Sequence, residues 1–134
     1  MRLLLAAILY AAMSLGAHAQ ENIDCGYPLN NNERTYCAEK ALSEANTKLE
    51  TIYRDLLARV IQMDDAVPEH LKGAAAALEE AQAAWVSFRE LDCNAYSFPY
   101  KGGTRGSELY RNCMIIMTMQ RIEDLQATLD DYGD

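Results

Sequence analysis

Residues 81–93 read AQAAWVSFRELDC, and this stretch decides the fold. Gln82, Trp85, Arg89 and Cys93 stand three, four and four residues apart, which is the spacing of side chains along one face of an α-helix. This face carries the only tryptophan of the chain beside a cationic side chain. We expect the arginine to stack on the ring, or to bury its stem there, while its guanidinium reaches a carboxylate. The candidate carboxylates are Glu33, Asp92 and Glu108.

The helical period continues on both sides of this stretch. Apolar residues recur every three or four positions over about residues 32–63, 68–96 and 107–132. No segment alternates between apolar and polar residues as a strand does. The sequence therefore predicts an all-α fold, a three-helix antiparallel bundle stabilised by disulfides and preceded by an irregular N-terminal arm.

Local signals indicate where these helices begin. Asn30 with Glu33 three residues later is typical of a helix N-terminus. Pro68 suits the first turn of the second helix, and Ser107 is the expected cap of the third.

The first 19 residues have the pattern of a secretory signal peptide. Arg2 precedes the apolar run LLLAAILYAAMSLG, and AHA ends the segment as a small-x-small cleavage site. The apolar run is shorter than the roughly 20 residues that span a bilayer, and no cysteine follows the cleavage site directly. We therefore expect residues 20–134 to form a single exported domain without a stable membrane anchor.

In an exported protein the four cysteines are expected to form disulfides, because thiols in an oxidising compartment usually pair. They are Cys25, Cys37, Cys93 and Cys113. Antiparallel helices would gather them at one end of the bundle, where all three connectivities are feasible; we favour the local pairs, first with second and third with fourth. None lies in a CxxC pair or near a histidine, so we expect no metal and no cofactor.

The charge of the chain restricts its partners. Twelve Lys and Arg stand against 20 Asp and Glu, a net charge of −8, and removal of Arg2 with the signal peptide leaves −9. Such a surface disfavours nucleic acid and anionic lipid and suits a cationic protein. The alternative is that the acidity serves solubility alone.

Candidate catalytic groups are sparse, and we expect no enzyme. His70 is the only histidine after residue 19, and no serine or cysteine adjoins it. Glu79 and Glu80 diverge on a helix, and Asp64 with Asp65 is a turn signal.

The chain resembles the lysozyme inhibitor LprI-like N-terminal domain family, small exported helical domains of bacteria. The resemblance rests on a Gln-x-x-Trp-x-x-x-Arg-x-x-x-Cys core, a glycine-containing loop, and a cysteine followed by threonine and arginine. These residues are Gln82, Trp85, Arg89, Cys93, Gly102, Gly103, Cys113, Thr118 and Arg121, and the first half agrees at Cys25, Glu33, Cys37, Ala45, Leu49 and Tyr53. The sequence departs from the family at Asn46 and Glu50, where Asp and Asn are usual.

The resemblance implies lysozyme inhibition for some members. We interpret Trp85, Arg89 and Arg121, with Gln82 and Thr118, as a structural motif inside the bundle, because paired buried charges are more often structural than functional.

The loop after the second helix is the candidate partner-binding segment. It combines Tyr96, Phe98 and Tyr100, which offer contact area, with Gly102 and Gly103, which allow close approach. The alternative is that Tyr96 and Phe98 tuck under the end of the bundle.

Two functions follow from these observations. The first is a periplasmic or secreted, non-enzymatic inhibitor of a cationic lysozyme-type enzyme, whose acidic cleft the loop would block. The second is a structural or interaction module of the cell envelope with an unidentified partner. The sequence sets no oligomeric state.

Overall fold

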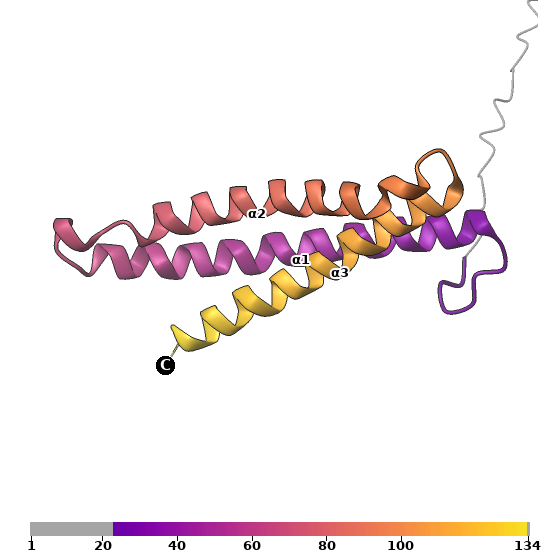
Figure 1. Cartoon of the computed structure of the whole chain (residues 1–134). Helices are drawn as coiled ribbons and strands as arrows, with labels where there is room; N and C mark the ends of the chain where they lie inside the picture. The colour runs from indigo at the N-terminus through magenta and orange to yellow at the C-terminus, as the bar shows by residue number, and fades with distance from the viewer. Residues whose placement is uncertain (1–22, 134) are drawn as a thin grey trace, which may run out of the picture.

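The computed structural model describes residues 23–133. These residues form three α-helices and no strand: α1 (Asn31–Asp65), α2 (Ala74–Ser97) and α3 (Thr104–Asp131), joined by the 3₁₀ turns η1 (Glu69–Leu71) and η2 (Phe98–Tyr100). Figure 1 shows α2 antiparallel to α1, while α3 returns along α1 and diverges from α2 toward its C-terminus. The predicted all-α bundle is confirmed. The signal peptide predicted over residues 1–19 lies outside the described residues.

The start of α1 follows the local sequence. Asn30 caps the helix, since its side chain accepts a hydrogen bond from the Glu33 N–H at 3.0 Å. The Glu33 carboxylate in turn accepts from the Leu29 N–H at 2.6 Å. Two amides without a helical partner are thereby satisfied, which is the purpose of a capping box. The predicted N-terminus is confirmed, and the helix begins at Asn31.

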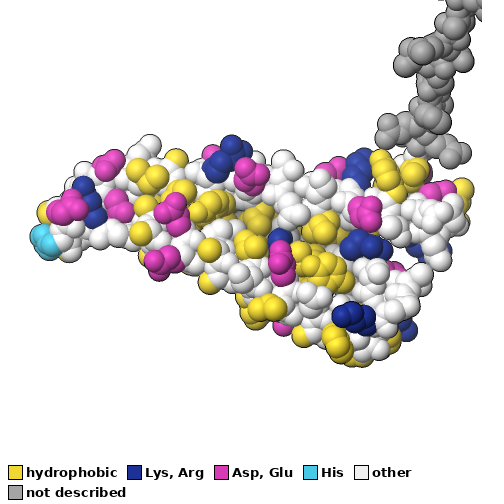
Figure 2. All heavy atoms as spheres, turned by 90° about the horizontal axis from the view of Figure 1, so that it is seen from above, with side chains coloured by type: hydrophobic (Ala, Val, Ile, Leu, Met, Phe, Trp, Pro, Cys, Tyr) yellow, Lys and Arg dark blue, Asp and Glu magenta, His cyan; other side chains and the backbone are white. Residues whose placement is uncertain are grey.

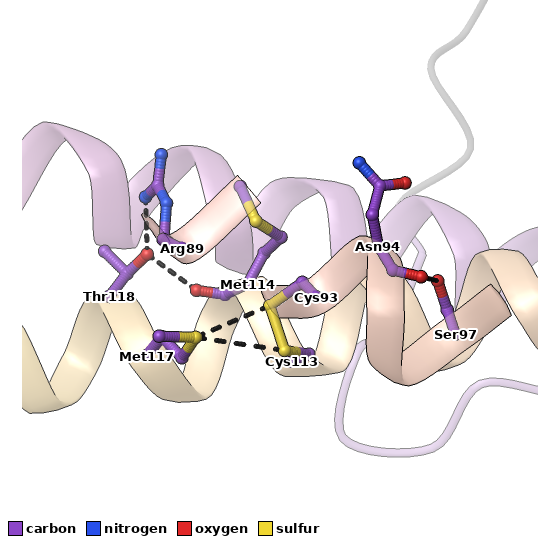
Figure 3. Close-up of a disulfide and its surroundings, with 8 residues drawn as sticks. All are labelled: Arg89, Cys93, Asn94, Ser97, Cys113, Met114, Met117 and Thr118. Atoms are coloured by element: carbon purple, nitrogen blue, oxygen red, sulfur yellow. Dashed lines mark hydrogen bonds between the residues drawn. A yellow bond between two sulfur atoms is a disulfide. The ribbon is translucent and has the colours of Figure 1, made fainter. Parts of the chain in front are cut away.

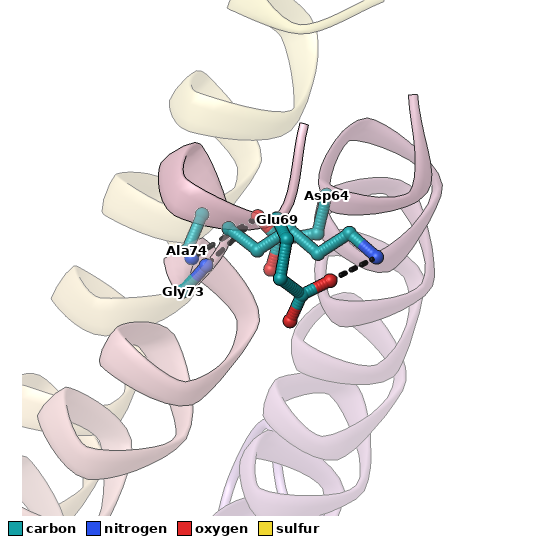
Figure 4. Close-up of polar contacts among 5 residues, drawn as sticks. Asp64, Glu69, Gly73 and Ala74 are labelled. Atoms are coloured by element: carbon teal, nitrogen blue, oxygen red, sulfur yellow. Dashed lines mark hydrogen bonds and ion pairs between the residues drawn. The ribbon is translucent and has the colours of Figure 1, made fainter. Parts of the chain in front are cut away.

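The beginning of α2 differs from the prediction. Pro68 does not start this helix but precedes η1, and α2 begins only at Ala74. The helical path is broken at Gly73, whose φ of 136° is incompatible with a right-handed helix. The side chain of Asp64, which belongs to α1, then caps the N-terminus of α2. Its carboxylate accepts from the N–H groups of Gly73 and Ala74, 3.2 Å each (Figure 4). It also accepts from the Ala75 N–H at 3.0 Å.

The beginning of α3 also differs from the prediction. The helix starts at Thr104 after Gly103, so Ser107 lies inside the helix and does not cap it. The reason is a close approach between α3 and η2. A Cβ atom on the buried Gly106 would lie 2.5 Å from the Tyr100 carbonyl oxygen, so only glycine lets α3 begin this close to the preceding turn.

The apolar core lies mainly between α1 and α3. Its buried members are Leu49, Leu56 and Val60 of α1 and Ile122 and Leu125 of α3. From α2, Leu78 and Trp85 pack against this cluster while staying partly exposed. Each fully buried aliphatic side chain contributes about 1.5–3 kcal/mol. Burial therefore stabilises chiefly the contact of α1 with α3, and α2 needs additional fastening.

Two disulfides add covalent links to the bundle, and one of them fastens α2. Cys93 of α2 is joined to Cys113 of α3 with Cα atoms 5.5 Å apart, and Cys25 of the N-terminal arm is joined to Cys37 of α1 at 5.4 Å. These are the local pairs that the sequence favoured. Each stabilises a small domain by about 2–4 kcal/mol, chiefly by restricting the unfolded chain. The arm and the end of α2 are thus covalently held at the same end of the bundle.

Replacing Asp64 by alanine is expected to weaken the junction of α1 and α2 in a pH-dependent way. The hydrogen bond from the Ala75 N–H is the main cause that lowers the pKa of Asp64 below the ordinary value of an aspartate. The N–H groups of Ala74 and Gly73 and the charge of Lys72 lower it further, against desolvation. Because the folded-state pKa is depressed, this stabilisation is present above the unfolded-state pKa and is lost as the pH falls through the folded-state value. Urea unfolding of wild type and Asp64→Ala should differ near neutral pH and converge in strong acid. Asp65→Ala is the control. If the difference in unfolding free energy between wild type and Asp64→Ala were the same in acid as at neutral pH, the capping role of Asp64 would be contradicted.

Replacing Gly106 by alanine is expected to lower the free energy of unfolding by about 1–3 kcal/mol, the usual cost of overpacking. Gly103→Ala is the matched control, because a Cβ there would lie 3.9 Å from the same Tyr100 carbonyl oxygen, an ordinary contact. Thermal or urea unfolding of the two variants measures the difference. Equal losses would show that the close approach of α3 to η2 is not what requires glycine.

Candidate functional site

The residues of the opening motif meet at the contact between α2 and α3. The Arg89 guanidinium carbon lies 4.9 Å from the centre of the Trp85 ring, and that of Arg121 lies 5.8 Å from it. The Arg121 Nε–H also donates to the Gln82 side-chain oxygen at 3.1 Å. We call these residues, together with Thr118, the Trp85 cluster. The predicted stacking of arginine on the tryptophan is therefore present, with a second arginine from α3.

Arg89 connects all three helices. Its side chain is only 7% exposed and donates from one terminal nitrogen to the Thr118 hydroxyl at 2.7 Å and to the Asn46 side-chain oxygen at 2.9 Å. The Thr118 hydroxyl donates in turn to the Met114 carbonyl at 2.6 Å, as Figure 3 shows. Burial is the main cause that lowers the pKa of Arg89, opposed by Glu90, and the guanidinium stays charged. The chain of bonds from Asn46 through Arg89 to Thr118 joins α1, α2 and α3.

The expectation that Arg89 reaches a carboxylate is wrong. Glu33 caps α1 instead, and neither Asp92 nor Glu108 bonds to the guanidinium. The acceptors are the neutral side chains of Asn46 and Thr118. The Trp85 ring and the charge of Glu90 also stabilise the cation, while the buried Arg89 Nε–H has no hydrogen-bond partner among the described residues.

Asn46 is the residue of this site that sequence reasoning missed. Its departure from the usual Asp of the family weakened any role for it, yet the amide oxygen accepts from Arg89. The available signal was its spacing, because Asn46 stands three and seven residues before Leu49 and Tyr53 of the apolar face of α1.

The predicted partner-binding segment begins with an exposed aromatic ridge, formed by Tyr96, Phe98 and Tyr100. Tyr96, Phe98 and Tyr100 are 59%, 64% and 43% exposed, so the alternative in which Tyr96 and Phe98 tuck under the bundle does not hold. Lys101 lies with its amino group 5.1 Å from the Phe98 ring centre, and the Arg105 guanidinium lies 4.6 Å from that of Tyr100. Two aromatic rings of this surface are therefore paired with cationic side chains.

The glycines of the loop set its shape. Gly102 has a φ of 98°, a left-handed conformation that favours glycine, and it turns the chain after η2. The Gly103 N–H donates to the Tyr100 carbonyl at 3.4 Å and closes that turn. We call residues 96–106, with the start of α3, the loop pole.

Charge is unevenly distributed along the chain. Between residues 98 and 111 the cations are Lys101, Arg105 and Arg111, and the carboxylate is Glu108. Arg111 lies 4.0 Å from the Glu39 carboxylate of α1, so Lys101 and Arg105 are the cations that give this surface its basic character. The whole chain nevertheless has a net charge of −8. The loop pole is therefore locally basic on an acidic protein.

Residues 23–133 hold neither a metal-binding cluster nor a membrane-spanning helix. Over residues 23–133 no group of three or more His, Cys, Asp or Glu side chains is placed to hold a metal ion. None of the helices described is long and apolar enough to cross a membrane. The absence of an enzymatic function stays a prediction.

Thr118→Val is expected to lower the free energy of unfolding by about 1–3 kcal/mol, because a buried guanidinium loses an acceptor. Valine keeps the shape of threonine and removes only the hydroxyl. Thr51→Val is the matched control, since the Thr51 hydroxyl also donates to the carbonyl one turn earlier, at 3.0 Å, but is exposed and accepts no hydrogen bond from an arginine. Urea unfolding measures both. Equal losses of unfolding free energy in the two variants would show that the hydrogen bond from Arg89 does not explain the effect of Thr118→Val.

Comparison with known proteins agrees with this geometry. A family model described as lysozyme inhibitor LprI matches residues 25–125, which include both disulfides, the Trp85 cluster and the loop pole. An uncharacterized protein of Rhizobium meliloti (strain 1021) is 26% identical over 118 residues, covering 85% of this chain and 85% of that protein. No solved structure gives a significant match. The extent of the family match shows that the chain belongs to the lysozyme inhibitor LprI family.

Proposed function

We propose that this protein is an exported, non-enzymatic inhibitor of a cationic lysozyme-type enzyme. Its membership of the LprI family supports lysozyme inhibition. The leader-like pattern of residues 1–19 and the paired cysteines support a periplasmic or secreted location. The inhibitor binds through its loop pole and performs no chemistry on its target.

The observation that carries this proposal is the pairing of cationic side chains with exposed aromatic rings on the loop pole. Enzymes of the lysozyme type use two carboxylates that flank the scissile glycosidic bond. Lys101 and Arg105 are the cations that would face those carboxylates in the cleft. Phe98 and Tyr100 already lie against these cations and would add apolar contact area beside them.

The net negative charge of the protein has a separate role in this mechanism. A cationic enzyme is attracted over a long range by the net charge of −8, which raises the rate of encounter and falls with salt. The basic loop pole is then the part of the surface that suits an acidic cleft.

Purified, oxidised protein is expected to inhibit a cationic lysozyme, more strongly at low than at high salt. The double variant Lys101→Ala with Arg105→Ala should raise the inhibition constant about tenfold, as loss of interfacial charge contacts does. The control is Lys40→Ala with Arg54→Ala, because both are exposed cations of α1 and their removal changes the net charge equally. A turbidity assay on bacterial cell walls measures the inhibition.

Two outcomes would contradict the proposal. Lack of inhibition at both ionic strengths would remove lysozyme as the target and leave the envelope module as the function. Equal effects of the two double variants would retain inhibition but exclude the loop pole as its site.

A further inference from the structure

A shallow groove runs between α2 and α3 beside the loop pole, outside the Trp85 cluster. It encloses about 620 Å³. Its lining residues are Asp92, Ala95 and Tyr96 of α2 and Leu109, Asn112, Cys113, Ile116 and Met117 of α3. We call it the α2–α3 groove.

The groove is largely apolar and open. Ile116 is 57% exposed and Tyr96 59%, so large hydrophobic side chains are left uncovered on both walls. Phe88 and Leu91 of α2, 56% and 70% exposed, extend the apolar surface of this helix. Figure 2 shows hydrophobic side chains gathered along the face of the molecule seen from above. Exposed apolar surface of this kind on a small protein marks a contact site.

The groove also contains a flexible side chain, that of Met117. The Met117 sulfur lies 3.6 Å from the Cys93 sulfur and 4.0 Å from that of Cys113, so the thioether lies on the disulfide that joins the two helices (Figure 3). A methionine side chain is flexible and polarisable and adjusts to different apolar partners, while the disulfide keeps the two walls together.

The charge of the groove restricts its occupant. Asp92 is the only charged side chain in the lining, and no cation lines the groove. Among the ion pairs within residues 23–133, none includes Asp92. A carboxylate beside apolar walls suits a ligand whose stem is apolar and whose tip is cationic, as in arginine and lysine.

We infer that the α2–α3 groove binds an arginine or lysine side chain carried by an apolar segment of a cationic protein partner. The stem would lie on Ile116 and Met117 and the cationic tip would reach Asp92. The partner's identity as a lysozyme-type enzyme rests on the proposed function, and the groove would then be a second contact beside the loop pole. A second copy of this chain is a poor occupant, because a symmetric contact would bring two Asp92 carboxylates and two net charges of −8 together.

The groove is tested first with a probe that is independent of any lysozyme. The peptide acetyl-Leu-Arg-Leu-amide is titrated into the full oxidised chain and followed by NMR, with acetyl-Leu-Gln-Leu-amide as the neutral control. The arginine peptide should shift the signals of Tyr96, Ile116 and Met117, and Asp92→Asn should abolish the difference between the peptides. Lack of shifts at these residues, or equal shifts with both peptides, would overturn the inference.

Direct binding to a cationic lysozyme by calorimetry then tests the partner. Asp92→Asn and Ile116→Ser should each weaken the complex about tenfold. Asp55→Asn and Ile61→Ser, exposed on α1, are the matched controls and should change it less than about twofold. The melting temperature of each variant confirms that it is folded.

The outcomes separate this inference from the proposed function. If lysozyme binds but neither groove variant matters, the groove is not a partner contact and the inference fails while the inhibitor function stands. If lysozyme does not bind but the arginine peptide does, the function fails and the groove stands as a site for basic segments. Sedimentation that shows a dimer dissociated by Ile116→Ser would overturn the inference in favour of a second copy.

Discussion

The hydrogen bonds of Arg89 join α2 to both other helices, whereas the apolar core mainly joins α1 to α3. The buried leucine, valine and isoleucine side chains join α1 to α3, whereas α2 has an alanine-rich first half and presents few large side chains to that core. Arg89 reaches from α2 to Asn46 on α1 and to Thr118 on α3, with its cation against the Trp85 ring. A single guanidinium thereby fixes the position of α2 relative to both other helices.

The end of the bundle that carries the loop pole is held in several ways. The Cys93–Cys113 disulfide joins α2 to α3 one helical turn after Arg89. Gly106 has no side chain, so α3 can begin directly against the Tyr100 carbonyl. These constraints give η2 a defined backbone while its aromatic rings stay in solvent. A surface with rigid backbone and exposed rings loses little conformational entropy on binding, which favours its use as a contact site.

The proposed loop contact and the inferred groove meet at Tyr96, which belongs to both. On one side of this residue the surface is basic and aromatic, and on the other it is apolar with the carboxylate of Asp92. A partner that bears both an acidic cleft and basic side chains near it would match the two regions at once. Complementarity of this alternating kind selects a partner more sharply than net charge does.

Residue spacing was enough to predict the three helices, the irregular arm and the cap at Asn30, because helical periodicity and capping depend on residues near one another in the chain. It favoured the local disulfides but left all three connectivities feasible, and the tertiary structure decided between them. The helix starts at Ala74 and Thr104 were missed because they depend on distant atoms, the Asp64 carboxylate and the Tyr100 carbonyl. The neutral partners of Arg89, the exposure of the aromatic ridge and the α2–α3 groove were likewise decided by tertiary structure. They depend on how three helices are rotated and placed against one another, and that placement follows from packing between residues that are remote in sequence.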